Sequence, residues 1–195
     1  MPPLKNQIPL LCGLDEAGRG PLAGPVCAAA VILSDDFPSG ILNDSKKLSA
    51  VAREKARIQI CSKAIAWGIG WASAAEIDEI NIHRASLLAM QRAFHAMNTS
   101  DFASEEINAV ADGLFIPDIP VPCRSLVKAD SLVPAVMAAS ILAKTARDKL
   151  MEYYAIFLPQ YGYEKHKGYP TKAHRQAIKL WGPSPIQRVS FNCKE

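Results

Sequence analysis

The first thirty residues constrain the fold most, because two short apolar runs flank a segment punctuated by glycine and proline. Residues 10–14 form the first run and residues 26–33 the second, and between them lie Gly18, Gly20, Pro21, Gly24 and Pro25. Short apolar runs on either side of such a segment are typical of neighbouring strands. A direct strand-to-strand connection predicts that the sheet contains an antiparallel pair.

The remaining pattern alternates between helix and strand. We expect a helix over about 50–63 that Ser49 caps, a strand over 64–72, and a helix over 74–98 that is broken near Asn81. Further along we expect strands over 107–111 and 124–128, a long helix over 131–154 with Pro134 in its first turn, and a helix over 171–181. This order predicts an α/β fold with a mixed sheet flanked by helices.

Length and composition limit the class of protein. A chain of 195 residues with 49% hydrophobic and 21% charged residues is that of an ordinary single globular domain. Its five cysteines include no CxxC pair, which favours reduced thiols over a disulfide frame or a zinc site. The polar, proline-containing start and a longest apolar run of eight residues predict neither a signal peptide nor a membrane span. We therefore expect a cytoplasmic protein, and a monomer, since no apolar stripe is obvious.

Charge and phosphate-binding motifs give less direction. The net charge of +3 permits a nucleic-acid partner without requiring one. No GxGxxG or GxxxxGK[ST] sequence opens a predicted helix, which disfavours nucleotide-cofactor folds.

Carboxylates follow the predicted strands. Asp15 and Glu16 follow the first strand, Asp112 ends the fourth, and Asp130 lies two residues beyond the fifth. Strand ends of an open α/β sheet are common ligand sites. Because neighbours on a strand point to opposite faces, Asp15 and Glu16 share one site only if the strand bends or stops between them.

Such a group of carboxylates would need cations. At about 4 Å, two carboxylates repel by about 4 kcal/mol at an effective dielectric near 20. Their hard oxygens favour Mg²⁺ or Mn²⁺ over zinc, and two such ions can clamp a phosphodiester. The residues alone leave other readings open: Asp112-Gly113 is also typical of a plain turn, and Asp130 or Ser131 of a helix cap.

Several segments, in order along nearly the whole chain, resemble the type 2 ribonucleases H, the ribonuclease HII family. The most specific is Gly13-Leu-Asp-Glu-Ala-Gly-Arg-Gly-Pro-Leu-Ala-Gly-Pro-Val26. Others are DSKKLS at 44–49, IN with Ala85 and Ala89-Met90 at 80–90, DG at 112–113, KAD at 128–130, AASILAK with Arg147-Asp148 at 138–148, HKGYPTKAH at 166–174, and GPSPIQR with Ser190-Phe191 at 182–191.

The resemblance implies a metal-dependent endoribonuclease with a ribonuclease H-like fold. It implies one catalytic domain over 1–195, in which residues from about 155 form a helix and loop extension that contacts nucleic acid. The substrate would be the RNA strand of RNA/DNA hybrids and ribonucleotides embedded in duplex DNA, cut on their 5′ side to leave a 3′-hydroxyl and a 5′-phosphate. The catalytic, metal-holding carboxylates would be Asp15, Glu16, Asp112 and Asp130, with Mg²⁺ or Mn²⁺ as cofactor.

The resemblance also implies the substrate contacts. Gly18, Arg19 and Gly20 match the GRG motif that contacts the ribonucleotide 2′-hydroxyl, and Tyr169 matches the tyrosine that stacks at the RNA–DNA junction. A site that hydrogen-bonds a hydroxyl can reject the analogue lacking it by roughly 10⁴-fold. Basic residues that we expect to contact phosphates, or else to form a solvated basic face, are Lys46, Lys47 and Lys167, together with Lys165, Lys172 and Arg175.

Two positions depart from the family pattern. Gln187 stands where histidine is common, and Leu114 where a polar residue is often found. Two rival functions remain: another metal nuclease or strand-transfer enzyme of the same broad fold, and a non-catalytic module that binds RNA/DNA hybrids. The intact carboxylates argue against the second, and DEAGRG with HKGY against the first.

Overall fold

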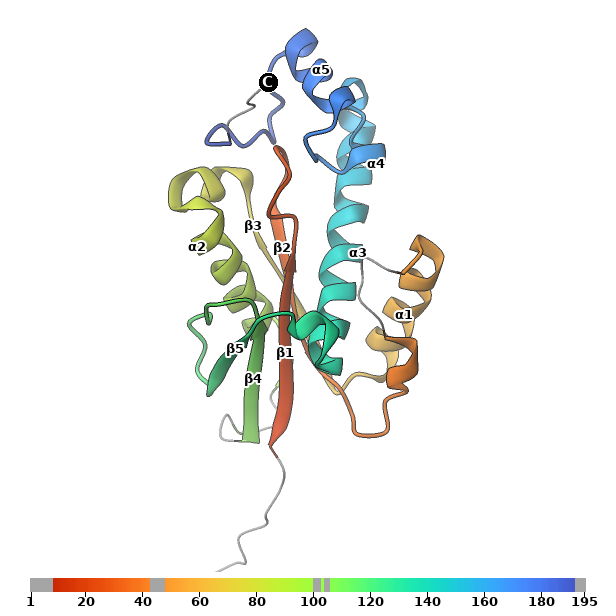
Figure 1. Cartoon of the computed structure of the whole chain (residues 1–195), viewed down its shortest axis with the longest axis vertical. Coiled ribbons are helices and arrows are strands. Elements are labelled where there is room, and N and C mark those ends of the chain that lie inside the picture. The colour runs from red at the N-terminus through yellow and green to blue at the C-terminus, as the bar shows by residue number, and fades with distance from the viewer. Residues whose placement is uncertain (1–8, 43–47, 100–102, 104–105, 192–195) are drawn as a thin grey trace, which may run out of the picture.

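A computed structural model describes residues 9–42, 48–99, 103 and 106–191, and within these the predicted α/β class is confirmed (Figure 1). Five strands form one mixed sheet in the order β3-β2-β1-β4-β5. They are β1 (Leu10–Ala17), β2 (Val26–Ile32), β3 (Ala66–Ala72), β4 (Ile107–Asp112) and β5 (Cys123–Leu126). β2 pairs antiparallel with both β1 and β3, as the initial hairpin predicts, whereas β1, β4 and β5 run parallel.

The helices cover both faces of the sheet. α2 (Ala74–His95) packs on one face, and α1 (Ala50–Lys63) and α3 (Pro134–Phe157) pack on the other (Figure 1). β2 is buried at every position because its alternate side chains enter the two cores: Ala28, Ala30 and Ile32 face α2, and Cys27, Ala29 and Val31 face α1 and α3.

Local chemistry sets several helix ends. The Ser49 hydroxyl accepts from Ala52 N at 3.2 Å and caps α1, as predicted. Pro134 is the first residue of α3, which runs to Phe157 rather than over 131–154, because residues 129–131 form a separate 3-10 turn. α2 contains the predicted break, because Asn81 has a φ of 66° and its side chain accepts from His83 N and Arg84 N, which starts the helix again.

Glycine lets a strand and a helix approach closely where β1 crosses α3. A Cβ on Gly13 would lie 2.2 Å from the Ala135 carbonyl carbon and 2.3 Å from Val136 N. The close contact brings the first turn of α3 against the middle of β1.

The C-terminal part is helical, as predicted. It consists of one three-residue turn of 3-10 helix, η4 (Pro159–Tyr161), followed by α4 (Tyr163–His166) and α5 (Lys172–Trp181), and it packs beside the end of α3 (Figure 1). A small core that includes Ala23, Met151, Tyr161 and Tyr163 joins it to the segment after β1. Among the described helices, none combines the length and apolarity that crossing a bilayer requires.

Candidate active site

Three of the four predicted carboxylates meet where the parallel pairing of β1 with β4 ends. The parallel ladder between these strands stops at the pair Leu14↔Ala111, so Asp15 and Asp112 are the next residues on each strand. A short 3-10 turn, η3 (Ala129–Ser131), carries Asp130 to the same place. One carboxylate oxygen from each of Asp15, Asp112 and Asp130 lies within 4.8 Å of the other two.

Main-chain contacts fix two of these carboxylates. Ala129 N donates to Asp112 Oδ1 at 2.7 Å, which ties the end of β4 to the turn that bears Asp130. Lys128, just before that turn, has a left-handed φ of 63°. Glu16 N donates to Asp15 Oδ1 at 2.7 Å. The geometry is therefore held by the backbone rather than by flexible side chains.

The electrostatics of the cluster favour a cation. Asp15 is 5% exposed. Burial raises the pKa of Asp15 well above its usual range, and the charges of Glu16 and Asp112 raise it further, against a hydrogen bond from Ser140. Converging oxygen ligands without a histidine or thiolate suit Mg²⁺ or Mn²⁺, so the residues present fit the expected metal.

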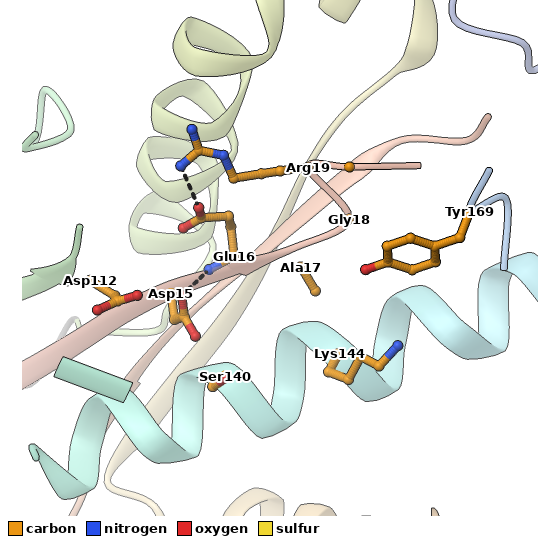
Figure 2. A pocket seen from close by; sticks show the side chains of 10 residues that line it. Asp15, Glu16, Ala17, Gly18, Arg19, Asp112, Ser140, Lys144 and Tyr169 are labelled. Carbon is orange, nitrogen blue, oxygen red and sulfur yellow. Dashed lines mark hydrogen bonds and ion pairs between the residues drawn. The ribbon is translucent and has the colours of Figure 1, made fainter. Parts of the chain in front are cut away.

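Glu16 is oriented differently from the other three carboxylates. β1 neither bends nor stops at Asp15 but stays paired with β2 as far as Ala17↔Cys27. The Glu16 side chain accordingly lies on the other side of the strand from Asp15, where Oε1 accepts from Arg19 at 3.0 Å (Figure 2). Burial raises the pKa of Glu16 while Arg19 lowers it, and its Oε2 is buried without a hydrogen bond among the described residues.

The GRG segment begins where β1 ends. Gly18 has a φ of 94°, and a Cβ there would lie 1.9 Å from Arg147 Nε. Two buried arginines hold this segment and the residues that follow it by their carbonyl groups. Arg188 donates to Gly18 O, Arg19 O and Gly24 O at 2.6, 2.9 and 2.8 Å, and Arg147 donates to Ala23 O and Pro25 O at 3.2 and 2.9 Å.

A pocket of about 410 Å³ joins these parts. It is lined by Asp15, Glu16, Asp112 and the GRG segment, and also by Ser140, Lys144 and Tyr169 (Figure 2). Tyr169 projects from the loop between α4 and α5, and Lys144 Nζ lies 6.0 Å from its ring centroid. Two of the three clustered carboxylates thus share one hollow with the GRG segment and the tyrosine.

Ser140 and Lys144 are pocket residues that the sequence reasoning missed. They are four apart on α3 and therefore lie on one face of that helix. Lys144 Nζ also donates to Asp148 at 2.8 Å. Their spacing within the AASILAK segment was the signal that could have identified them.

Of the lysines that we expect to contact phosphates, Lys167 is described by the structure, whereas Lys46 and Lys47 lie outside the described residues. The Lys167 ammonium donates to Glu152 Oε1 at 2.8 Å and to Glu164 O.

Of the two departures from the family pattern, Leu114 is exposed and Gln187 forms a main-chain bridge with Ala23.

Comparison with known proteins gives a consistent result. Residues 12–194 match the family profile described as Ribonuclease HII. A ribonuclease HII of Treponema denticola is 54% identical over 95% of this chain and 99% of its own length, and one of Dechloromonas aromatica is 47% identical over 98% and 95%.

Solved structures share the fold at lower identity. The RNase HII in a PCNA:RNase HII complex from Archaeoglobus fulgidus is 24% identical, with a TM-score of 0.74 over 95% of this chain and 96% of that one. Bst-RNase HIII in complex with Mn²⁺ is 17% identical, with a TM-score of 0.74 over 96% of this chain and 68% of that one. The ribonuclease H-like fold is therefore confirmed.

Proposed function

The chain belongs to the ribonuclease HII family and is an endoribonuclease that acts on RNA/DNA hybrids, and we propose that Asp15, Glu16, Asp112 and Asp130 form its catalytic site. The observation that carries the assignment is the convergence of Asp15, Asp112 and Asp130 within 4.8 Å, since Asp15 and Asp112 line the pocket that also holds the GRG segment. Members of the family depend on divalent metal, and Mg²⁺ or Mn²⁺ is the ion that these oxygens suit best.

Each carboxylate has a distinct place in the proposed mechanism. Asp15, Asp112 and Asp130 hold the metal, and Glu16 joins them by exchanging its contact with Arg19. Divalent metal, when bound, supplies activation of the attacking water and stabilisation of the leaving 3′-oxygen. Ser140 and the Glu16 main-chain N–H keep the Asp15 carboxylate aimed into the pocket.

The GRG segment is the proposed sensor of the ribonucleotide. Arg188 holds the carbonyl groups of Gly18 and Arg19, and Arg147 holds those of Ala23 and Pro25 just after the segment. The two glycines add no side chain on the pocket side. A deoxyribonucleotide would leave polar groups built for the 2′-hydroxyl without a partner, which is the strongest basis for rejection. We propose that Gly18, Arg19 and Gly20 select a lone ribonucleotide in DNA, with cutting on its 5′ side.

Tyr169 is the proposed stacking residue. Its ring is 40% exposed, and a Cβ on Gly20 would lie 3.8 Å from it, so sensor and ring are adjacent. An aromatic ring stacked on a nucleotide is worth about 1–3 kcal/mol. Residues from about 155 onward thus act as the nucleic-acid-contacting part of one domain that spans 1–195.

The phosphate contacts and the assembly state are proposals too. Lys46, Lys47 and Lys167 are proposed to contact the backbone of the duplex, and Lys167 would exchange Glu152 for a phosphate. We also propose that the protein is a monomer, because no apolar stripe is obvious in its sequence, and that it acts in the cytoplasm. Light scattering during size-exclusion chromatography measures the oligomeric state.

The experiment compares three labelled duplexes: DNA with a single ribonucleotide, an RNA/DNA hybrid, and all-DNA. Each is incubated with Mg²⁺, Mn²⁺ or EDTA. We expect metal-dependent cutting 5′ of the lone ribonucleotide and within the hybrid, with all-DNA intact. Cutting of the hybrid alone would remove the single-ribonucleotide specificity, and folded protein that binds but cuts nothing would favour a binding module.

A further inference from the structure

The turn that presents Tyr169 is unusually tight. It follows α4, and two successive residues, Lys167 and Gly168, have left-handed φ values of 51° and 84°. A Cβ at Gly168 would lie 2.5 Å from Ala23 O. The turn is therefore seated directly on the segment that follows the GRG sequence.

Two histidines bond to the main chain of this turn from opposite sides. His174, on α5, has Nδ1 3.0 Å from Tyr169 O, and Thr171 N also donates to that carbonyl at 2.8 Å. Tyr169 N donates to His166 O at 2.8 Å. The backbone on both sides of the tyrosine thus depends on His166 and His174.

The two imidazoles also contact each other. Their centroids are 4.6 Å apart with an interplanar angle of 16°, and Tyr163 packs edge-on against both rings. His174 is fully buried. Neither histidine lines the pocket, whereas the Tyr169 ring does (Figure 2).

The hydrogen bonds assign one proton to each ring. Gly168 N donates to His166 Nδ1 at 3.2 Å, so that nitrogen is bare and Nε2–H donates to Tyr161 O at 2.8 Å. Tyr169 O can only accept, so His174 carries its proton on Nδ1. His174 Nε2 is consequently bare, and it is buried without a hydrogen bond among the described residues.

We propose that His166 and His174 form a stacked, neutral pair that positions Tyr169 for its contact with the nucleic acid. The inference rests on the stacking role proposed for Tyr169. Both histidines are positioning residues, since neither lines the pocket. Their effect passes through the main chain of residues 168–171.

A second proton on either ring would disrupt the turn. On His166 it would remove the acceptor for Gly168 N, and on His174 it would place a charge on a buried nitrogen beside the other ring. Burial lowers the pKa of both histidines, which keeps the pair neutral at physiological pH. The titratable and charged groups around the pair are Tyr161, Tyr163, Glu164, Lys167 and Arg175. Arg147 of α3 also contacts this turn, because it donates to the Lys167 carbonyl.

The test is a double-mutant cycle on cleavage of DNA that carries one ribonucleotide. His174→Leu removes the Nδ1 donor, and His174→Asn keeps an amide N–H near that position. We expect His174→Leu to lower kcat/KM about tenfold, chiefly through KM, and His174→Asn to restore most of it. In a Tyr169→Ala background the same His174→Leu change should alter kcat/KM by less than about twofold.

Controls separate the possible failures. His95→Leu, which replaces an exposed histidine at the end of α2, should leave kcat/KM at the wild-type value. A full tenfold loss from His174→Leu in the Tyr169→Ala background would overturn the positioning role, because the histidine would then act elsewhere. Cleavage by Tyr169→Ala at the wild-type rate would refute the stacking role, and the positioning role that depends on it would then be refuted too.

A pH profile keeps the proposal testable if His174→Leu does not fold. The ratio of wild-type to Tyr169→Ala kcat/KM should hold its value at and above pH 6.5 and fall toward one as the pH is lowered through the reduced pKa values of the two histidines, because protonation releases the tyrosine. The ratio cancels the titration of the catalytic carboxylates, which both proteins share. A ratio that already falls above pH 6.5, or that stays constant until the protein unfolds in acid, would overturn the neutral-pair account.

Discussion

Replacing Asp15 with asparagine should make the metal-free protein more stable and the enzyme inactive. The change keeps the shape of the side chain and the acceptor for Glu16 N, but removes a buried charge from the carboxylate cluster. Catalysis is lost because a neutral amide is a poor ligand for a hard divalent cation.

The magnitude follows from the geometry. Two charges 4.8 Å apart, the limit of the cluster, repel by about 3.5 kcal/mol at an effective dielectric near 20. Shared protons relieve part of this at neutral pH, so we expect Asp15→Asn to raise the free energy of unfolding by about 1–3 kcal/mol in EDTA. For a chain of this length that corresponds to about 2–4 °C in Tm for each kcal/mol.

The pH dependence has a definite sign. Because the folded state raises the pKa of Asp15, it binds a proton more tightly than the unfolded chain does. The metal-free wild type should therefore lose stability as pH rises from the unfolded pKa of Asp15 to its raised folded value, and the variant should lack this loss. The difference between the two proteins is largest at and above neutral pH.

Thermal and urea unfolding in EDTA and in Mg²⁺ measure these effects. Mg²⁺ should stabilise the wild type and leave Asp15→Asn almost unchanged. Asp118→Asn, which neutralises an exposed carboxylate outside the cluster, is the matched control and should resemble wild type. A variant that is less stable than wild type in EDTA, or that still cleaves, would refute the reasoning.

Three further predictions concern the sensor, the fold and the metal. Arg19→Ala should reduce the preference of the protein for a ribonucleotide-containing duplex over all-DNA more than it reduces duplex affinity, as measured by equilibrium binding with Ca²⁺; unchanged preference would refute a sensor role for this residue. Gly13→Ala should destabilise the fold by about 1–3 kcal/mol in urea unfolding, because its Cβ would overlap the backbone of α3, and a neutral effect would contradict that contact. Mn²⁺ affinity by calorimetry should rise between about pH 6 and 8, because Asp15 and Glu16, whose pKa values are raised, must lose protons to bind it; an affinity independent of pH would contradict those protonation states.

Local patterns predicted most of the elements, and the misses have physical causes. The cap at Ser49, the break at Asn81 and proline at the start of α3 depend on neighbours in sequence, so they were predictable. The extension of β1 to Ala17 was not, because β2 holds those residues through pairing that polar side chains do not signal.

The site was predictable to the same degree. Strand ends predicted where carboxylates gather, since parallel strands bring their carboxyl ends together. The orientation of Glu16 toward Arg19 depends on how far β1 stays paired with β2, and the engagement of Lys167 by Glu152 depends on packing of the turn after α4 against α3. Such contacts leave no periodic trace in the sequence.

Titration of Mn²⁺ into the wild type and Asp112→Asn, followed by electron paramagnetic resonance with a ribonucleotide-containing duplex present, tests the central claim most directly. Asparagine retains an acceptor for Ala129 N, so fold and duplex binding should persist. We expect Mn²⁺ affinity to fall at least about tenfold and cleavage to disappear with it. Unchanged Mn²⁺ binding in Asp112→Asn, or cleavage at the wild-type rate, would contradict a metal centre built on these carboxylates.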